Sequence, residues 1–553
     1  MILYDFFCII FLLIQFFISG SLFHSLFIKT RFDADINAIP RILFFGIFLN
    51  ITFLQIWHLF LPINLLCSLV MHFIQLFFIF YNKSFFKYLQ IFKTLSLESY
   101  FLFFLFLLWI SGLTNSHIRP YDSGLYHLPT INWISSYPII KGLANLNIWY
   151  GINSNLFLLI SVTKNYPFYL NFLWGFNGVF LCIGFLSFFI IPFEYLTQMK
   201  KKNTEILYRS IFLIPLIHYS FYYFPGTSTD LPIFIIGCIL SIEFFLLIAN
   251  KTSYHHIIPI LVFLGITIKT SFLFFGLGVL IIFIIKIYLI KKNIKLYFFK
   301  LSFGVFIISS IIWLSRGVIL SGYPLLPLKS ISLPVSWKMD KDDASVMRNS
   351  LNNKDIFHDE HLKLKDLLSF KLKVLKGALL PGHKKVEMFY PIIFGFIGLV
   401  YVLKLKKKNN YIILFPILIQ FLIWFTIPKN RYSSFAAWWL CSHYFSIILE
   451  DIFSKKHTKY IFLLILILSI APHKIDYLGQ EKIFFPKYIK KEIPKADIKP
   501  FKTSSGFEIF TLEDESKDQC WESNLLCTRF PNKKLRPYDE NDLSKGFYTI
   551  KID

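Results

Sequence analysis

This chain is constrained above all by the recurrence of apolar segments about 20 residues long, the length that crosses the hydrocarbon core of a bilayer as one helix. The segment from Tyr100 to Gly112, for example, contains no charged residue. Counting such segments along the chain predicts about fourteen membrane spans. They lie near residues 2–25, 42–61, 63–82, 98–116, 169–193, 210–224, 231–249, 257–268, 272–290, 301–320, 389–403, 411–427, 434–450 and 459–472. We therefore expect an all-α polytopic membrane protein.

The composition agrees with this class and argues against others. Hydrophobic residues make up 55% of the 553 residues and charged residues only 16%, which is outside the usual range of soluble proteins. The formal net charge of +24 could suggest a nucleic-acid partner. However, the lysines and arginines stand mostly in short clusters between apolar segments, where they fix membrane topology. We therefore predict the lipid bilayer, and no nucleic acid, as a partner.

The basic clusters also predict which way the chain faces. Counted alternately along the spans, all of them fall on one side, and the positive-inside rule makes that side cytoplasmic. The expected protein is a multi-pass protein of the cytoplasmic (inner) membrane whose C-terminal tail is extracytoplasmic. The clusters are Lys29 with Arg31 and Arg41; Lys83, Lys87 and Lys93; Lys200–Lys202 with Arg209; Lys251; Lys291, Lys292 and Lys295; Lys404–Lys408; and Lys455, Lys456 and Lys459.

Two cysteines lie close together in the polar tail, Cys520 and Cys527, whereas the other cysteines lie in or beside apolar segments. A disulfide between them would place the tail in an oxidising compartment. That placement agrees with the orientation that the basic clusters predict. The alternative is a pair of free thiols in a cytosolic tail.

Two outward segments are long enough to have structure of their own. The first, Lys329–Glu387, has leucines at near-helical spacing from Phe357 to Leu375, which predicts a surface helix. The cluster Asp355–His361 could bind a metal ion, but a solvated helix start is the simpler interpretation because no cysteine or longer histidine spacing supports a site. The second, His473–Asp553, contains short β-prone runs and is expected to form a small cap.

Polar residues that face outward near the end of a span are candidates for chemistry, and Asp122 is the first along the chain. It lies in Tyr121–Asn132, a polar stretch just after the apolar segment that ends near Gly112. In a short interfacial helix, Asp122 and Tyr126 would share a face, with His127 beside them. There the acid could act as a general base or hold a metal ion. The alternative is that Asp122 or Ser123 caps a helix that runs through Leu125 and Tyr126.

Asp230 and Lys269 are the next candidates. Asp230 precedes Pro232 at the start of a span and is either an N-cap or a second active-site acid. Lys269 lies between two apolar spans on the outward side, where an unpaired charge inside hydrocarbon would cost several kcal/mol. It therefore needs an anionic partner, unless its side chain snorkels to the interface.

Arg316 and Arg431 are also on the side opposite to the basic clusters. Arg316 stands at the outward end of its span, and Arg431 lies in the turn Lys429–Ser433. With Lys269 they give three separated cations near two acids on one aqueous face. Because arginine binds phosphate through paired hydrogen bonds and lysine binds it as a point charge, a phosphate-bearing lipid is the predicted ligand.

These motifs, in this order and on this side, resemble the GT-C superfamily of glycosyltransferases, polytopic enzymes that use lipid-linked sugar donors. The closer resemblance is to an uncharacterised bacterial membrane-protein family and covers most of the chain from Leu97 onward. The motifs that carry it are Tyr121–His127, Ser228–Pro232, Lys269, Arg316–Pro324, Pro428–Tyr432 and Cys520–Cys527.

The resemblance implies a lipid-phosphate sugar donor, with Asp122 as the base or as an acid that orients the acceptor. We therefore expect an inverting transfer of a sugar from a polyprenyl-phosphate donor to a glycan or lipid acceptor of the cell envelope, with Asp230 and His127 completing the catalytic set. A paired-acid motif next to Asp122 is absent, so the cofactor stays open between none and a divalent ion, Mg²⁺ or Mn²⁺. The implied substrate-binding residues are Tyr126, Lys269, Arg316, Tyr323 and Arg431.

The expected organisation has a GT-C-like core preceded by additional spans. Residues 1–96 form N-terminal transmembrane helices outside this core, although cores of this kind usually begin at the chain start. The other segments are the core at 97–328 with a catalytic loop at 117–168, an extracytoplasmic helical loop at 329–388, C-terminal transmembrane helices at 389–472 and an extracytoplasmic cap at 473–553.

Other function classes remain open at this point. A polymerase or ligase of lipid-linked glycans would also face outward, but it would not need a sugar-monophosphate donor. A transporter or flippase would place ionisable residues or broken helices near the bilayer midplane, often in repeated halves. Glu243 lies within a span, but no partner for it and no internal repeat is visible in the sequence.

Overall fold

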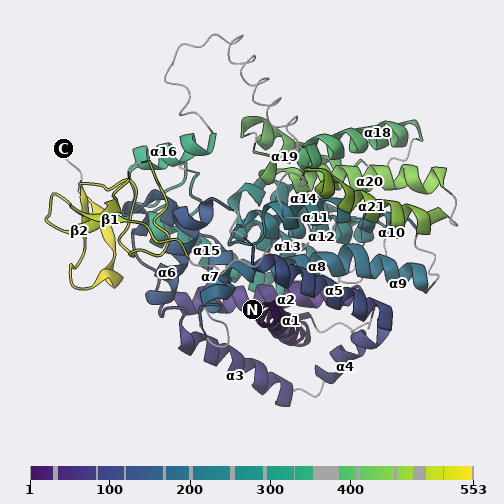
Figure 1. The fold of residues 1–553 in the computed structure, drawn as a ribbon, viewed down its shortest axis with the longest axis horizontal. Coiled ribbons are helices and arrows are strands. Elements are labelled where there is room, and N and C mark those ends of the chain that lie inside the picture. The colour runs from purple at the N-terminus through teal and green to yellow at the C-terminus, as the bar shows by residue number, and fades with distance from the viewer. Residues whose placement is uncertain are drawn as a thin grey trace, which may run out of the picture.

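The computed structural model of this chain is mostly helical, with a small region of β-strands at its C-terminal end (Figure 1). The structure describes residues 2–28, 35–81, 85–116, 120–165, 170–198, 203–249, 256–290, 296–328, 330–352, 385–405, 411–427, 429–453, 457–476, 493–514 and 516–550. The main helices are α1 (Ile2–Phe23), α2 (Ala38–His58), α3 (Leu65–Tyr81), α4 (Phe85–Leu89), α5 (Leu97–Thr114), α6 (Leu128–Ser136), α7 (Asn155–Val162), α8 (Gly178–Phe185), α9 (Ile191–Thr197), α10 (Asn203–Ser210), α11 (Leu213–Tyr222), α12 (Asp230–Ile248), α13 (Ile257–Ile268), α14 (Leu273–Ile290), α15 (Leu296–Ser321), α16 (Lys341–Asn352), α18 (Tyr390–Lys404), α19 (Leu414–Thr426), α20 (Ser434–Ile452) and α21 (Thr458–Asp476).

Eight helical segments in the described part of the chain are long and apolar enough to cross a membrane. Each coincides with an apolar run that the sequence predicts as a span. An apolar run in a membrane folds as a helix because a helix satisfies all backbone hydrogen bonds within the segment itself. The chain is therefore a multi-pass helical membrane protein. The eight segments are Ile2–Ile28, Ala38–His58, Leu97–Thr114, Phe172–Thr197, Asp230–Ile248, Thr270–Ile287, Gly304–Ser321 and Lys385–Lys404.

The other predicted spans are bent, shorter or less apolar in the structure. Leu65–Tyr81 and Phe85–Thr94 form a pair bent by 93°, which would raise the count to nine if it is one span. Three further helices, α13, α19 and Thr458–Ile470 of α21, are apolar but short. The predicted spans at 210–224 and 434–450 correspond to α11 and α20, and neither is among the eight. Length and composition thus give eight or nine spans in the described residues, where the sequence predicts about fourteen.

The first two helices pack closely on each other through glycine. A β-carbon added to Gly20 would lie 1.8 Å from the carbonyl oxygen of Ile42, and one added to Gly46 would lie 1.8 Å from that of Phe16. Without side chains at these positions, the backbones of α1 and α2 approach each other as small residues allow in membrane helices.

These N-terminal helices belong to the same packed body as the rest of the bundle. α1 contacts α5, and α2 contacts α7 and α13. Arg41 of α2 donates hydrogen bonds of 2.8 and 2.9 Å to the two carboxylate oxygens of Glu243 on α12. Both side chains are buried, so this ion pair gives Glu243 the partner that was not visible in the sequence.

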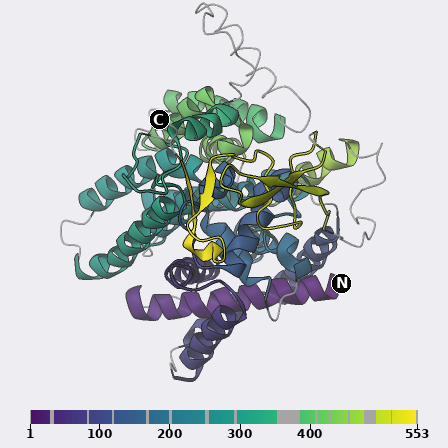
Figure 2. The same cartoon turned by 90° about the vertical axis from the view of Figure 1, so that its left-hand side faces the viewer.

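The C-terminal cap consists of two small antiparallel sheets. β1 (Ile498–Lys502) pairs with β2 (Glu508–Leu512), and β3 (Leu535–Pro537) pairs with β4 (Phe547–Thr549). Figure 2 shows this cap (yellow) at the end of the helical bundle that faces the viewer.

A disulfide joins Cys520 to Cys527 within the cap. The carbonyl oxygen of Cys527 accepts a hydrogen bond of 3.0 Å from the hydroxyl of Tyr150, and the N–H of Phe547 donates one of 2.9 Å to the carbonyl of Lys141. These contacts attach the cap to the segment that follows α6.

The long polar segment before α18 is described only in part. Residues 330–352 are described and end in α16. The predicted surface helix at 357–375 and the cluster Asp355–His361 lie outside the described residues.

Candidate active site

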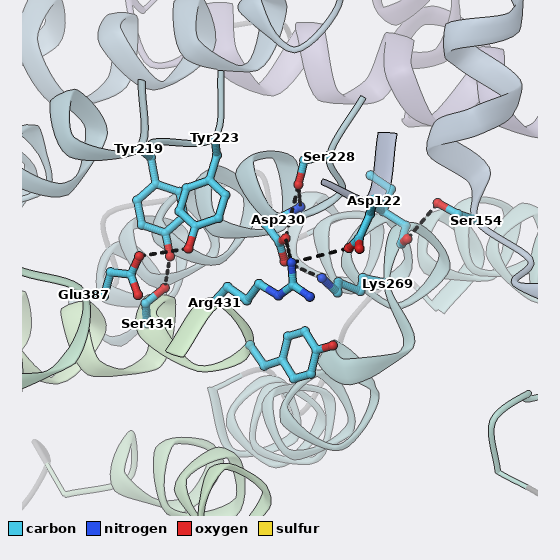
Figure 3. A network of polar contacts seen from close by, with 12 residues as sticks. Asp122, Ser154, Tyr219, Tyr223, Ser228, Asp230, Lys269, Glu387, Arg431 and Ser434 are labelled. Atoms are coloured by element: carbon cyan, nitrogen blue, oxygen red, sulfur yellow. Dashed lines mark hydrogen bonds and ion pairs between the residues drawn. The ribbon is translucent and has the colours of Figure 1, made fainter. Parts of the chain in front are cut away.

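Four charged side chains from distant parts of the sequence meet at one place (Figure 3). Nη1 of Arg431 lies 3.4 Å from Oδ2 of Asp122 and 3.4 Å from Oδ2 of Asp230. The ammonium group of Lys269 donates a hydrogen bond to Oδ1 of Asp230. Two carboxylates and two cations therefore form one continuous network, which we call the ion-pair network.

Asp122 stands directly before a single helical turn, Ser123–His127, that leads into α6. Its carboxylate makes no capping hydrogen bond to that turn, so the capping role considered from the sequence is not seen. The side chain is 25% exposed. Among the described residues its hydrogen bond comes from Arg431 alone, which leaves the carboxylate able to accept a proton or hydrogen bond from a ligand.

Asp230 is held much more tightly. It is the first residue of α12, and its side chain is 3% exposed. The hydroxyl of Ser228 donates to Oδ2 of Asp230 at 3.1 Å and accepts from its backbone N–H at 3.1 Å. Asn177, just before α8, donates to the carbonyl oxygens of Gly226 and Ser228 at 2.9 and 2.8 Å. The loop before α12 is therefore fixed from two sides.

Lys269 lies at the break between α13 and α14. Its backbone is extended (φ −151°, ψ 119°), which interrupts the helical run. The hydroxyl of Ser154, just before α7, donates to the carbonyl of Ile268 at 2.8 Å and so supports the break. The ammonium group lies 4.6 Å from the centroid of the Tyr432 ring, within the range of a cation–π contact. With Asp230 it has the anionic partner that its position requires.

A cavity of about 350 Å³ lies against the ion-pair network. Asp122, Lys269 and Arg431 line it, and so do many apolar side chains. One of these, Phe274, is 47% exposed, so the apolar lining continues to the outer surface of the helical bundle. The principal apolar residues are Phe274, Leu326, Leu328, Met347, Ile423 and Ile427. A ligand that fits this cavity combines a charged or polar group with hydrocarbon.

Lys429 lines the same cavity, and sequence reasoning did not single it out. Across the described residues, its ammonium group has no hydrogen bond or ion pair. Counting it with Lys269 and Arg431 gives three cations against Asp122 and Asp230, an excess of one positive charge. Its position two residues before Arg431, in a turn that the sequence predicts to face outward, is a signal that could have identified it.

Burial and the charges of the site shift the pKa values of its titrating groups. The negative charge of Asp230 raises the pKa of Arg431 above its ordinary value. Burial lowers the pKa of Lys429, and the positive charge of Arg431 acts in the same direction. Burial raises the pKa of Tyr432 to about 12, so this phenol stays protonated near neutral pH.

Tyr126 and His127 are neighbours in sequence but have different surroundings. Tyr126 lines the cavity and stacks on Trp149, with ring centroids 5.8 Å apart. Burial raises the pKa of Tyr126 well above its ordinary value. Nδ1 of His127 lies 3.0 Å from Oγ1 of Thr227, and the ring is buried outside the cavity lining. Burial lowers the pKa of His127 to about 4, so its ring is neutral near pH 7.

Two residues singled out in the sequence do not join the ion-pair network. Arg316 is buried beside His58 in a separate, smaller cavity. Tyr323 is also buried, and its hydroxyl donates to the carbonyl of Met339 at 3.3 Å. Tyr323 thereby fixes the segment that follows α15.

A second buried polar group lies beside Arg431 in Figure 3. The hydroxyl of Tyr223 donates to Oε1 of Glu387 at 2.8 Å, and Tyr219 shares a hydrogen bond with Ser434. Sequence reasoning missed Glu387, although an acid shortly before a proline at the start of a span is the same signal that identified Asp230.

The charged residues of the network do not form a site for a divalent metal ion. Within the described ranges, no group of three or more His, Cys, Asp or Glu residues could hold one. Both carboxylates of the network face Nη1 of Arg431, and Asp230 also contacts Lys269. Because cations already occupy the space between the carboxylates, the arrangement does not fit Mg²⁺ or Mn²⁺, which require several converging oxygen ligands.

Comparison with known proteins identifies the family. Residues 1–438 match the family described as a domain of unknown function, DUF8201, and the chain belongs to it. The match begins well before Leu97 and includes the N-terminal helices together with all four residues of the ion-pair network. No curated protein and no solved structure matches the chain.

Proposed function

We propose that this member of the DUF8201 family is a membrane glycosyltransferase that moves a sugar from a polyprenyl-phosphate donor to a glycan or lipid acceptor on the extracytoplasmic face. The observation that carries the proposal is the single cavity in which an accessible carboxylate, Asp122, lies with an excess of positive charge and an apolar lining. These three features complement an acceptor hydroxyl, a phosphate and a lipid chain.

In the proposed reaction, Asp122 takes the proton of the acceptor hydroxyl as its oxygen attacks the anomeric carbon. The new glycosidic bond forms while the bond from that carbon to the phosphate oxygen breaks. The lipid phosphate leaves with the electron pair, and the configuration at the anomeric carbon inverts.

The cations of the cavity have the complementary task. Negative charge develops on the leaving phosphate, and preorganised cations in a site shielded from water stabilise it most effectively. Lys429 is the cation without an acidic partner among the described residues, so it is the first contact we assign to the phosphate. Arg431 and Lys269 are already oriented by Asp230 and complete the set.

Asp230 is therefore proposed as a positioning residue rather than as the base. Its carboxylate is buried and accepts hydrogen bonds from Ser228, Lys269 and Arg431. The proposal also includes a GT-C-like core, about fourteen spans, residence in the inner membrane and an extracytoplasmic cap.

The variant Asp122→Asn tests the base. It keeps the size of the side chain but cannot take the proton, so transfer should fall by about 10²–10⁴-fold. The measurement is sugar transfer from a polyprenyl-phosphate donor by purified protein in detergent or liposomes. Asp539→Asn, the same change in an exposed ion pair of the cap, is the matched control and should retain activity. Full activity of Asp122→Asn would show that the base is assigned wrongly.

The donor distinguishes the proposal from its rivals. Turnover with lipid monophosphate sugars and none with lipid diphosphate glycans supports the glycosyltransferase. Turnover with the diphosphate alone identifies a polymerase or ligase. Movement of a labelled lipid across liposome membranes without any new glycosidic bond identifies a transporter or flippase.

A further inference from the structure

Arg316 carries a buried charge that the ion-pair network does not explain. It lies on α15 and is 3% exposed. Its one hydrogen bond within the described residues runs from Nη1 to Nδ1 of His58, at 2.9 Å. Nε2 of His58 lies 3.1 Å from the carbonyl oxygen of Tyr137 and must carry the proton there. Nδ1 is then the acceptor, so His58 is neutral and offers no negative charge.

A buried guanidinium without a counter-ion is costly. Removing an ion from water costs several kcal/mol unless an opposite charge or several hydrogen bonds replace the solvent. In the part of the chain that the structure describes, no carboxylate forms an ion pair with Arg316, and its Nε has no hydrogen-bond partner. The site therefore lacks a negative group.

Two more unpartnered donors line the same small cavity as Arg316. The hydroxyl of Thr130 and the indole N–H of Trp133 are buried without hydrogen-bond partners in the described residues. Both are on α6, three residues apart, and so share a face of that helix. Three donors from two helices, one of them charged, line one cavity in which no carboxylate is present. This is the chemistry of an anion site.

The size of the cavity limits what it can hold. Its volume is about 20 Å³, little more than the roughly 10–15 Å³ that one water molecule needs. This is close to the size of one monatomic anion such as chloride and well below that of a phosphate, a sulfate or a sugar. The cavity shares Ile152, Asn153 and Phe157 with the larger cavity, so it lies directly behind the proposed active site.

We propose that Arg316, Thr130 and Trp133 bind a halide-sized monovalent anion, with chloride as the physiological occupant. The anion supplies the charge that Arg316 lacks and connects α6 to α15 behind the larger cavity. This inference does not depend on the proposed glycosyltransferase activity. It also gives Arg316 a role other than contact with a lipid phosphate.

The test is the thermal unfolding of the purified full-length protein in sodium chloride and in sodium gluconate at matched ionic strength. Chloride should raise the Tm saturably, and gluconate, which is too large for the cavity, should not. A Tm that is the same in both salts would overturn the proposal, because the site would then hold water only.

Conservative variants locate the effect. Thr130→Val and Trp133→Phe each remove one donor and keep the shape of the side chain, so each should raise the half-saturating chloride concentration by about tenfold. Arg316→Gln should abolish the chloride effect. The indole N–H of Trp174 is also buried without a hydrogen-bond partner among the described residues but lies outside this cavity, so Trp174→Phe should respond to chloride like the wild type. If Thr130→Val and Trp133→Phe also respond like the wild type, chloride binds elsewhere and the assignment is wrong.

Discussion

Asp122 and Asp230 contact the same guanidinium nitrogen of Arg431, yet their surroundings differ in a way that decides their chemistry. Asp230 is buried and already accepts hydrogen bonds from Ser228 and Lys269, whereas Asp122 is partly exposed and accepts one long contact. A general base needs an accessible lone pair. At the scale of single residues, this difference separates two acids that the sequence places in one proposed catalytic set.

Deprotonation of Lys429 should set the upper pH limit for binding of the lipid-phosphate donor. The charge of Lys429 attracts the phosphate only while the ammonium is protonated, and burial lowers the pKa of this group in the free protein. As pH rises, the charge is therefore lost below the ordinary lysine value of about 10.4, and the KM for the donor should rise. Lys429→Met should raise the KM about tenfold at neutral pH, whereas Lys429→Arg should move the alkaline limit upward.

The measurement is the KM for the lipid-phosphate donor as a function of pH. Lys533→Met, in an exposed part of the cap, is the matched control and should follow the wild-type profile. An unchanged profile for both Lys429 variants would remove this lysine from the donor site.

The sequence was sufficient to bring some of these residues together but not others. Predicted side and depth in the membrane selected Asp122, Asp230, Lys269 and Arg431. A charged residue at the outward end of a span must lie near the membrane surface, where it can meet other such residues. The same criteria selected Arg316, which faces a different helix. Sidedness places a residue along the membrane normal, but only helix packing decides which neighbour it meets.

At the scale of elements, the cap holds the turn that carries Asp122. The N–H of Trp521 donates to the carbonyl of Gly124 at 3.0 Å, and Gln519 donates to the carbonyl of Tyr121 at 2.6 Å. A β-carbon at Gly124 would lie 2.4 Å from the indole of Trp521. Gly124 is thus required by the close approach of these two segments.

Gly124→Ala should therefore displace the turn and lower kcat by about tenfold or more, since small misplacements of catalytic groups are costly. A steady-state assay of kcat and of the KM for the donor checks this, and Gly124→Ala with Trp521→Leu should recover part of the loss because the smaller side chain relieves the clash. Gly112→Ala is the control, because nothing lies within 4 Å of a β-carbon there. Unchanged kcat in Gly124→Ala would mean that the cap does not position Asp122.

Element lengths show where the sequence misleads about spans. Hydropathy found every long apolar helix in the described residues, but it also counted apolar runs whose helices are too short to cross the bilayer alone. α11 has 10 residues and α13 has 12, whereas a span needs about 20. α20 has 19 residues, yet it is not among the eight segments that are both long and apolar enough. An apolar run in the sequence does not show where its helix begins and ends.

At the scale of the whole molecule, the Arg41–Glu243 ion pair joins the N-terminal helices to α12, whose first residue is Asp230. Because the two charges are buried, removing one partner breaks a buried ion pair and is strongly destabilising. The N-terminal spans, which seemed separate from the core in the sequence, are therefore part of the body that carries the site.

The sidedness of the molecule can be tested through the cap. Hydrogen bonds from Trp521 and Gln519 fix the cap to the Asp122 turn, so the side that holds the cap also holds the proposed active site. The basic clusters predict that this side is extracytoplasmic. In a background with Cys520 and Cys527 changed to serine, the other cysteines are buried, and single exposed cysteines can be labelled with a membrane-impermeant maleimide.

In intact cells, Ser516→Cys in the cap should be labelled, whereas Thr197→Cys at the end of α9, beside the basic residues Lys200–Lys202, should be labelled only after the membrane is permeabilised. The reverse pattern would place the cap, Asp122 and the cavity in the cytoplasm. The donor would then have to be a cytoplasmic-leaflet lipid, and transfer at the outer face would be excluded whatever the catalytic residues are. Labelling of both positions in intact cells would instead mean that an odd number of spans between them has been miscounted.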